Sequence, residues 1–398
     1  MRSTVAATSP SQLRQHNAAE VLDYAWSTEA FTASGVIAHT GLTRSTAIGL
    51  CDELVDRGWL IELENQRAAG DYSMGRPARR YRLNAAAACI VGVDAGEHST
   101  RVTVADLRGD ELAHRVVAAD HGAFGENPVT ADARRSDIVA AVDATLEHAG
   151  LASARVLAIA IGVPAPVDAR GASPQRHDFW ARLNPQLVTA FDGRDLIVLV
   201  DNDANLAALA EGWRGAGAGV DNYITMLSGE RLGSGIVVDG NLLRGRFGAA
   251  GEMEFLSQVE GVGGAHGIAW LARAWSADAG SAASATEVLR AADRGENPAT
   301  GIRDRLADHF ALIFTALTNL IDTEVIVVSG AVAESVGPLL EIVAERLPPH
   351  VTASPPRLEA STLGENVVVD GAVRKALTHV QAIALTLDVS AAPEAATG

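Results

Sequence analysis

The chain has 398 residues, 48% of them hydrophobic, which is enough to bury the cores of two or three domains. No apolar run reaches about 18 residues, and the N-terminus lacks the apolar core of a signal peptide, so we expect a cytoplasmic protein with no membrane partner. Two cysteines, Cys51 and Cys89, are too few for a disulfide framework or a Cys-rich zinc site. The net charge of −17 argues against broad adhesion to nucleic acid.

The charge is unevenly distributed along the chain. Residues 1–88 contain nine Arg and nine Asp or Glu, so this segment is neutral and the remainder carries the whole deficit. Within the neutral segment the arginines gather towards its end. A neutral segment of this kind can still present a local basic face.

Helical spacing predicts three short helices at the N-terminus. The first covers 11–27 with Ser11 as a possible cap, and the second covers 32–40 with Thr32 as its cap. Gly41 ends the second helix. A third helix follows, which Thr43 caps and Gly58 terminates.

Two short helices around a glycine turn are typical of a helix-turn-helix. The second of these helices would place its first residues at base edges and phosphates, and these residues are Thr43, Arg44, Ser45 and Thr46.

The next segment resembles a wing. Strands are predicted over 59–63 and 79–83, and the loop between them is polar, contains glycine and is basic towards its end. Arg76 is a candidate to lie in the minor groove of DNA, and Arg79 and Arg80 are candidates to contact its phosphates. The alternative is a small domain that binds another protein, with solvated arginines. Helix order, turn, cap and wing agree with one another, which favours DNA binding.

After a linker at 84–88 the pattern changes to α/β. Strands are predicted over 89–94, 100–106, 111–117, 156–163 and 196–200, with a helix over 136–149 before the fourth. This order is typical of the actin-like ATPase fold of many sugar kinases. Helices over 267–277, 285–294, 300–321 and 335–346, with strands over 324–329 and 357–361, repeat the outline. The predicted fold is therefore α/β: an N-terminal winged helix-turn-helix (1–85), a first lobe (86–203) and a second lobe with C-terminal helices (204–398).

The stretch 200–252 is the candidate site. Asn202 and Asp203 follow an apolar strand, and ligands in open α/β sheets sit beyond the carboxyl ends of strands. A carboxylate there can take a proton from a substrate hydroxyl. Gly229, Gly233 and Gly235 permit a tight turn that can approach phosphates. The plain alternative is a strand, a helix and a hairpin with no site, in which Asn202 and Asp203 only cap the helix.

Several blocks together carry a family resemblance. A winged helix followed by IAIGVPAPVD, VDNDANLAALAEG and GSGIVVDGNLLRGRFGAAGE resembles the ROK family (repressors, open reading frames and kinases) from about residue 13 to 378. Family kinases phosphorylate sugars with ATP. The family's regulators keep the kinase fold as a sugar sensor and add the winged helix.

The resemblance implies that the nucleotide elements are eroded. The first phosphate loop, Asp-x-Gly-Gly-Thr-Lys in kinases, reads Asp94-Ala95-Gly96-Glu97-His98-Ser99 here. The second, Gly-Thr-Gly-x-Gly, reads Gly229-Glu230-Arg231-Leu232-Gly233, and the adenosine-side turn is Ser329-Gly330-Ala331. Carboxylates beside a polyphosphate are repulsive, so we expect no ATP cofactor.

On the sugar side the resemblance is mixed. Asp203 matches the family's general base, Asn202 its sugar-binding neighbour and Glu252 the glutamate of its Gly-Glu-x-Gly-His motif. Asn184 falls near a sugar-contacting asparagine, close to Trp180 and Arg182. Phe255 stands where the motif histidine ligates zinc, the cysteine cluster is missing and His266 stands alone, so we predict no structural zinc.

These features together predict a DNA-binding transcriptional regulator, a repressor, with Asp203 as a vestigial base and no enzymatic activity. Its expected partners are palindromic operator DNA, a sugar or sugar-phosphate effector bound by Asn184, Asn202, Asp203 and Glu252, and a second copy of the chain as a homodimer or dimer of dimers. The alternatives are an active ATP-dependent sugar kinase with an accessory winged helix, and a protein-interaction module.

Overall fold

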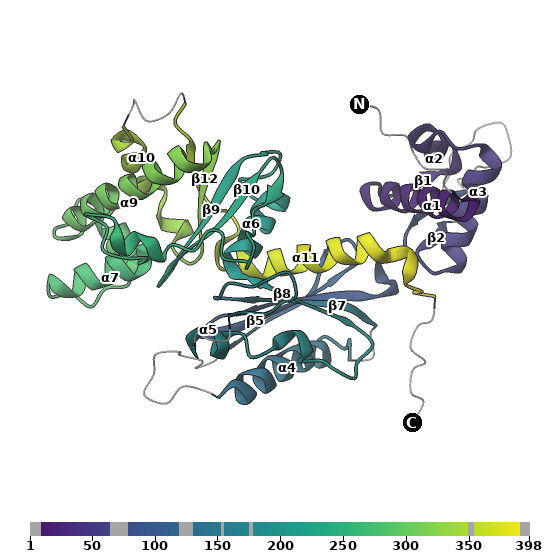
Figure 1. Ribbon diagram of the computed structural model, residues 1–398, viewed down its shortest axis with the longest axis horizontal. Helices are drawn as coiled ribbons and strands as arrows, with labels where there is room; N and C mark the ends of the chain where they lie inside the picture. The colour runs from purple at the N-terminus through teal and green to yellow at the C-terminus, as the bar shows by residue number, and fades with distance from the viewer. Residues whose placement is uncertain are drawn as a thin grey trace.

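The computed structural model describes residues 9–63, 79–118, 130–152, 155–174, 178–348 and 354–390. The chain forms an N-terminal body and two α/β lobes, and one long C-terminal helix runs between these parts (Figure 1). None of the helices in these ranges has the length and apolar character needed to cross a membrane.

The N-terminal body contains the three predicted helices and a small antiparallel sheet. The helices are α1 (Pro10–Ser27), α2 (Ala33–Thr40) and α3 (Arg44–Asp56), and the sheet has the order β1 (Phe31–Thr32), β3 (Arg80–Leu83) and β2 (Leu60–Leu63). The predicted hairpin of β2 and β3 is confirmed, and β1 was not anticipated. The loop predicted as the wing, 64–78, lies outside the described residues.

Side-chain caps decide where these helices begin. Thr32 accepts a hydrogen bond from the Gly35 backbone N–H, and Gly41 ends α2 with a φ of 71°, a left-handed conformation that favours glycine. The first helix begins earlier than predicted: its cap is Ser9, in a reciprocal capping box with Gln12, and not Ser11.

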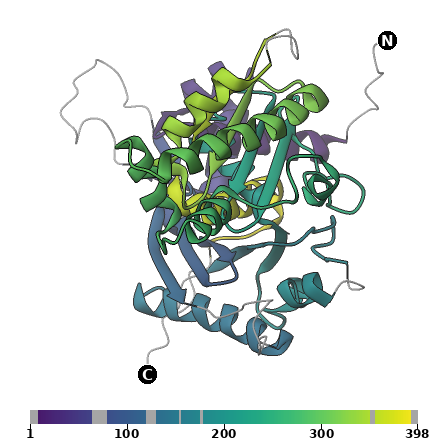
Figure 2. The ribbon, with the colours of Figure 1, turned by 90° about the vertical axis from the view of Figure 1, so that its left-hand side faces the viewer.

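The first lobe is built on a five-stranded sheet. Its order is β6 (Glu111–Ala118), β5 (Ser99–Asp106), β4 (Cys89–Ala95), β7 (Val156–Val163) and β8 (Ile197–Asn202). Figure 2 shows α4 (Ala131–His148) on the outer side of this lobe. This helix was predicted to begin near residue 136, but Thr130 caps it five residues earlier. A short helix, α5 (Asp178–Leu183), and α6 (Asp203–Arg214) follow β7 and β8.

The second lobe repeats the first sheet. Its order is β11 (Asn241–Leu242), β10 (Leu232–Val238), β9 (Tyr223–Ser228), β12 (Val325–Ser329) and β13 (Arg357–Ala360). In each sheet three antiparallel strands are followed by two parallel ones. The second lobe therefore repeats the outline of the first, as predicted. Its helices are α7 (Ile268–Asp278), α8 (Ala285–Asp293), α9 (Ala299–Ile321) and α10 (Gly337–Arg346).

The C-terminal helix α11 (Val367–Ile383) corrects the expected division of the chain. The range 204–398 was assigned to the second lobe, but α11 packs on β4 and β7 of the first lobe and on α6. The approach to α6 is so close that a Cβ on Gly371 would lie 1.8 Å from the carbonyl oxygen of Leu206. The sequence predicted C-terminal helices but not which sheet they would cover.

One hydrophobic core joins the N-terminal body to the first lobe. It includes the fully buried Trp59 and Tyr81 together with Leu377, Val380 and Val389 from the C-terminal segment. The other face of the first sheet and the second lobe have cores of their own. The N-terminal body is therefore packed against the first lobe and α11 through a shared interior.

Candidate functional site

The first turn of α3 presents three of the four predicted DNA-contacting side chains to solvent. Thr43, Arg44 and Ser45 are exposed, and Thr46 is half-buried. The Thr43 hydroxyl accepts a hydrogen bond from the Thr46 backbone N–H at 3.4 Å and lies 2.9 Å from the Thr46 hydroxyl, so these two threonines also define the start of the helix. The orphan N–H groups of this turn and Arg44 form a surface suited to phosphates.

The two arginines at the start of β3 have different surroundings. Arg79 donates hydrogen bonds to both carboxylate oxygens of Glu62, and its Nη1 lies 2.7 Å from Oδ1 of Asp52. These hydrogen bonds to Glu62 raise the pKa of Arg79 further above its usual range. Arg79 is thus already neutralised within the body, whereas Arg80 is half-buried on the strand. Arg76 lies outside the described residues, and its role stays a prediction.

Three of the four predicted effector residues line a pocket between the two lobes. Asn202 and Asp203 line it from the end of β8, and Glu252, Arg231 and Ser234 line it from the second lobe. Its volume is about 80 Å³. Sites for small molecules are usually of ~300–1,000 Å³, so this pocket is smaller than a typical small-molecule site.

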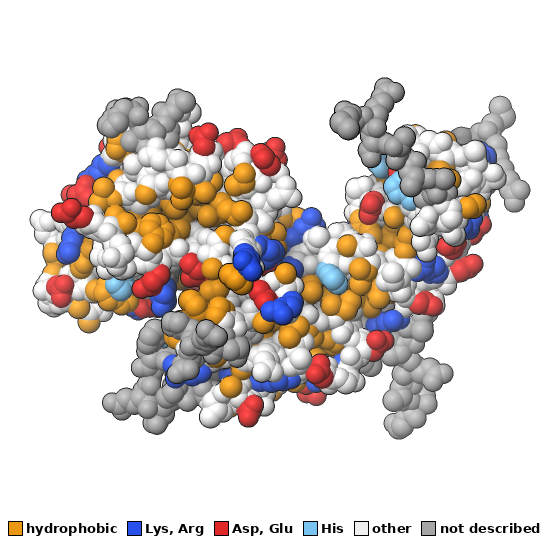
Figure 3. Space-filling view, in the orientation of Figure 1, with side chains coloured by type: hydrophobic (Ala, Val, Ile, Leu, Met, Phe, Trp, Pro, Cys, Tyr) orange, Lys and Arg blue, Asp and Glu red, His pale blue; other side chains and the backbone are white. Residues whose placement is uncertain are grey.

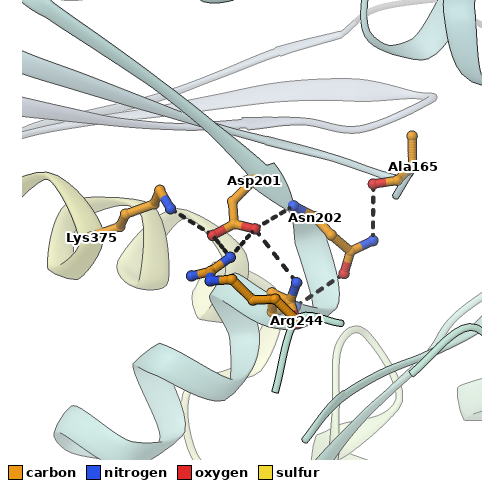
Figure 4. Close-up of polar contacts among 6 residues, drawn as sticks. Ala165, Asp201, Asn202, Arg244 and Lys375 are labelled. Atoms are coloured by element: carbon orange, nitrogen blue, oxygen red, sulfur yellow. Dashed lines mark hydrogen bonds and ion pairs between the residues drawn. The ribbon is translucent and has the colours of Figure 1, made fainter. Parts of the chain in front are cut away.

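Asn202 and Asp203 are held at the start of α6 as the structural alternative anticipated. Asn202 accepts a hydrogen bond from the Asn205 backbone N–H at 3.1 Å, and its Nδ2 donates to the carbonyl oxygen of Ala165 at 3.2 Å (Figure 4). Asp203 accepts a hydrogen bond from the Ala204 backbone N–H at 2.7 Å. Capping and the bond to Ala165 account for both polar atoms of the Asn202 side chain, but capping leaves the second oxygen of Asp203 without an assigned structural role.

The electrostatics around Asp203 are unusual. The pKa of Asp203 is raised to about 8, mainly by burial. The hydrogen bond from the Ala204 backbone N–H lowers the pKa, and the carboxylates of Asp94, Glu252 and Glu97 contribute to raising it. Burial also raises the pKa of Glu252, which Arg231 partly offsets. The pKa of Asp94 is raised to about 6 by burial. Carboxyl groups from both lobes therefore crowd one pocket.

Glycines place Glu252 and the neighbouring strand. Gly251 has a φ of 88°, and a Cβ there would lie 2.1 Å from the carbonyl oxygen of Ser234, so no other residue fits this approach. The Ser234 hydroxyl in turn donates a hydrogen bond to the carbonyl oxygen of Gly251. At Gly235 a Cβ would lie 2.2 Å from the carbonyl oxygen of Ala204 in α6. Gly235, expected at a phosphate turn, is thus explained by helix packing.

One wall of the pocket is aromatic, which the sequence only partly indicated. Phe179 and Trp180 of α5 line the pocket, and the Arg231 guanidinium lies 5.5 Å from the centre of the Phe179 ring. Arg231 also forms an ion pair of 3.3 Å with Glu254. Aromatic faces commonly stack against the apolar faces of ligands and carboxylates accept hydrogen bonds, so this combination fits a polyhydroxylated ring.

Asn184 is not placed in the pocket. It is 1% exposed, and its amide donates hydrogen bonds to the Gly171 carbonyl oxygen and the Ser173 hydroxyl while accepting one from the Leu187 N–H. The structure therefore assigns it to the support of a loop, which corrects its expected contact with an effector. A motif match gives the position of a side chain along the chain but not the direction in which it points.

A buried arginine was missed. Arg134 of α4 is 2% exposed and donates hydrogen bonds to the carbonyl oxygens of Ala95, Gly96 and Leu183. It ties the first phosphate-loop position to the end of α5, which carries the aromatic wall. The sequence offered no signal for this role.

The region expected to lack zinc can be described directly. Phe255 is 48% exposed, and the His266 ring stacks on Trp270 with ring centres 3.9 Å apart. Within the described ranges, no three His, Cys, Asp or Glu side chains are grouped so that they could hold a metal ion. The expectation of no structural zinc stays a prediction.

Comparisons with known proteins relate most of the chain to one family. A family model described as "ROK family" matches residues 90–378. The chain is 31% identical over 205 residues to a glucokinase of Halalkalibacterium halodurans, covering 44% of this chain and 62% of the relative. It is 25% identical over 213 residues to a xylose repressor of Caldicellulosiruptor bescii, covering 53% and 51%. These matches span less than two thirds of either relative.

Solved structures extend the comparison to the N-terminal body. A ROK family transcriptional regulator described as a homologue of the E. coli MLC protein superposes with a TM-score of 0.71 at 20% identity, covering 95% of this chain and 99% of that one. A ROK family glucokinase from Streptomyces griseus with bound glucose and AMPPNP gives a TM-score of 0.57 at 25% identity, covering 73% and 99%. The regulator thus shares the fold of nearly the whole chain.

Proposed function

Because the chain belongs to the ROK family, we propose that it is a DNA-binding transcriptional regulator, acting as a repressor, whose kinase-like lobes sense a sugar or sugar-derived effector. The observation that carries the proposal is the N-terminal body of three helices and a hairpin, which shares a core with the kinase-like fold and exposes Thr43, Arg44 and Ser45 at the start of α3. This first turn is where a recognition helix contacts DNA.

The proposed mechanism couples the pocket to the operator. A homodimer would present two N-terminal bodies to a palindromic operator, with half-sites one or more helical turns apart. A sugar bound by Asp203 and Glu252 would change the separation of the lobes and thereby the spacing of the two bodies. The affinity for DNA then changes by the difference in binding free energy of the sugar for the two states.

The test is binding of the full chain to DNA from its own upstream region, measured by fluorescence anisotropy at several salt concentrations. Replacing Arg44 by Ala is expected to weaken binding and to lower the salt slope by about 1 if Arg44 contacts a phosphate. Arg290→Ala, an exposed arginine of α8 in the second lobe, is the matched control. If both variants bind the operator as the unmodified chain does, the assignment of α3 to DNA is wrong.

The second candidate is an ATP-dependent sugar kinase. It is favoured by the 31% identity to a glucokinase and by Asp203 at the position of the family's general base. A coupled assay of ADP release over hexoses and amino sugars separates the two. Sustained turnover that Asp203→Asn abolishes would establish the kinase.

A further inference from the structure

We propose that Arg244 and Lys375 are positioning residues of the pocket: both pair with Asp201, Arg244 to hold the lobes together and Lys375 to tie the pocket to the helix beside the N-terminal body. The part of this proposal that concerns DNA binding rests on the proposed function, whereas the role of the ion cluster in holding the lobes together does not.

Asp201 is the centre of this cluster. It is 1% exposed, and Nη1 of Arg244 lies 2.7 and 2.6 Å from its two carboxylate oxygens (Figure 4). Nζ of Lys375 lies 2.7 Å from Oδ2. The backbone N–H of Asn202 donates a hydrogen bond to Oδ1 at 3.0 Å. The same carboxylate therefore binds both cations and fixes the residue that leads into Asp203.

The three charged residues come from three separate parts of the fold. Asp201 belongs to β8 of the first lobe, Lys375 to α11, and Arg244 to the loop after β11 of the second lobe. That loop leads on to Glu252, and Asp201 directly precedes Asn202, so the cluster is connected along the chain to both walls of the pocket. When the lobes separate, Arg244 must leave Asp201, whereas Lys375 moves with the first lobe and keeps the buried carboxylate paired.

Lys375 is the sole lysine of the sequence, which otherwise uses 31 arginines as its cations. A compact ammonium group suits a single carboxylate oxygen, whereas the two Arg244 contacts span both oxygens. Figure 3 shows Lys and Arg side chains gathered near the middle of the molecule, where α11 passes between the lobes. The sequence alone already singles out Lys375, because it is the only lysine in the chain.

The helix that carries Lys375 continues to the N-terminal body. Beyond α11, the carbonyl oxygens of Leu385 and Leu387 accept hydrogen bonds from Arg57 at 2.6 and 2.9 Å. The indole N–H of Trp59 also lies within hydrogen-bonding distance of the Leu387 carbonyl oxygen. A displacement of α11 at Lys375 is therefore passed to the body through direct contacts. The cluster connects the state of the pocket with the position of α3.

The experiment uses the sole lysine as its probe. The full chain is treated briefly with an amine-reactive reagent, and labelling of Lys375 is followed by peptide mass spectrometry, separately from the N-terminal amine. Asp201→Asn keeps the shape of the side chain but removes its charge. It is expected to speed the labelling of Lys375 by roughly tenfold, because the ion pair that shields the amine is lost.

Small-angle X-ray scattering tests whether the Arg244–Asp201 ion pair holds the two lobes together. Arg244→Met is expected to increase the radius of gyration, and Arg244→Lys to restore it in part. Arg246→Met, on the same loop but exposed and without a contact to Asp201 in the described structure, is the matched control. Arg244→Met leaves Asp201 paired with Lys375, so this variant is expected to fold even if Asp201→Asn does not.

Each outcome decides the proposal. Equal labelling of Lys375 with and without the Asp201 charge, or equal scattering by Arg244→Met and Arg246→Met, would overturn it. If the Asp201 cluster holds the lobes together and the chain binds operator, Arg244→Met should shift operator affinity or its response to sugar by about 5- to 150-fold. If the unmodified chain binds no operator, the proposed function fails, whereas labelling and scattering still test the role of the cluster.

Discussion

Replacing Asp203 by Asn is expected to stabilise the folded chain at high pH. The folded state holds the pKa of Asp203 at about 8, against 3.8 for the free group, so it keeps a proton that the unfolded chain releases. This contribution is fully present below pH 3.8 and is lost as the pH rises through 8. Asn has no such loss, so the difference in unfolding free energy between the variant and the unmodified chain grows over this range.

The size of the effect follows from the shift and from exposure. One pKa unit corresponds to about 1.4 kcal/mol, so the whole shift from 3.8 to about 8 would give roughly 6 kcal/mol. Asp203 is only partly buried at the pocket, and solvent screening reduces that value. We expect Asp203→Asn to be more stable by about 1–3 kcal/mol at pH 8.5 and nearly unchanged at the lowest pH at which the chain remains folded.

Urea unfolding at pH 5.5, 7.0 and 8.5 measures this difference. Asp195→Asn, at an exposed carboxylate in the loop before β8, controls for the change of one charge. The same preparations are titrated with sugars, since a residue kept at a cost in stability is expected to serve binding. If the difference in unfolding free energy between Asp203→Asn and the unmodified chain is the same at all three pH values, the electrostatic reasoning is refuted.

Three further predictions concern the contacts that hold the parts together. Gly371→Ala is expected to destabilise the chain by at least ~1–3 kcal/mol in urea unfolding, because its Cβ would overlap the backbone of α6, whereas Gly301→Ala in α9 has open space and should gain up to about 1 kcal/mol. Arg108 donates hydrogen bonds to three carbonyl oxygens at the end of α1, so Arg108→Ala should loosen the N-terminal body and let the chain accept operators with altered half-site spacing, which gel shift would detect. Arg79→Ala should lower the unfolding free energy by about 1 kcal/mol through lost ion pairs, whereas Arg80→Ala should weaken operator binding at unchanged stability.

Local signals in the sequence predicted most elements of the fold. Thr32 and Thr43 were identified as caps because a hydroxyl before an apolar period satisfies an orphan N–H, and both act in this way. Strand β7 was predicted to the residue, since its buried run has no competing turn signal. The start of α4 was misplaced because the apolar period begins later than the cap at Thr130.

The position of α11 could not be read from local signals. Its contact with α6 depends on Gly371 lying against the backbone of Leu206, which is 165 residues away along the chain. Nothing in the spacing of apolar residues distinguishes a helix that covers the nearer sheet from one that crosses to the other. The shared core of the N-terminal body and the first lobe has the same origin, because residues such as Val389 meet Gly58 only in the folded chain.

The choice between sensor and kinase depends on the phosphate side of the pocket and not on Asp203. A pKa of about 8 is compatible with a general base, because catalytic pKa values work best near the operating pH. The second phosphate-loop position differs: Glu230 is held by an ion pair of 2.6 Å with Arg273 of α7. A nucleotide phosphate there would compete with Glu230 for Arg273, and Asp94 and Glu97 act on the same pocket from the first loop. The retained base therefore favours neither function, whereas the carboxylates of the two loops disfavour ATP, and nucleotide affinity is the measurement that separates them.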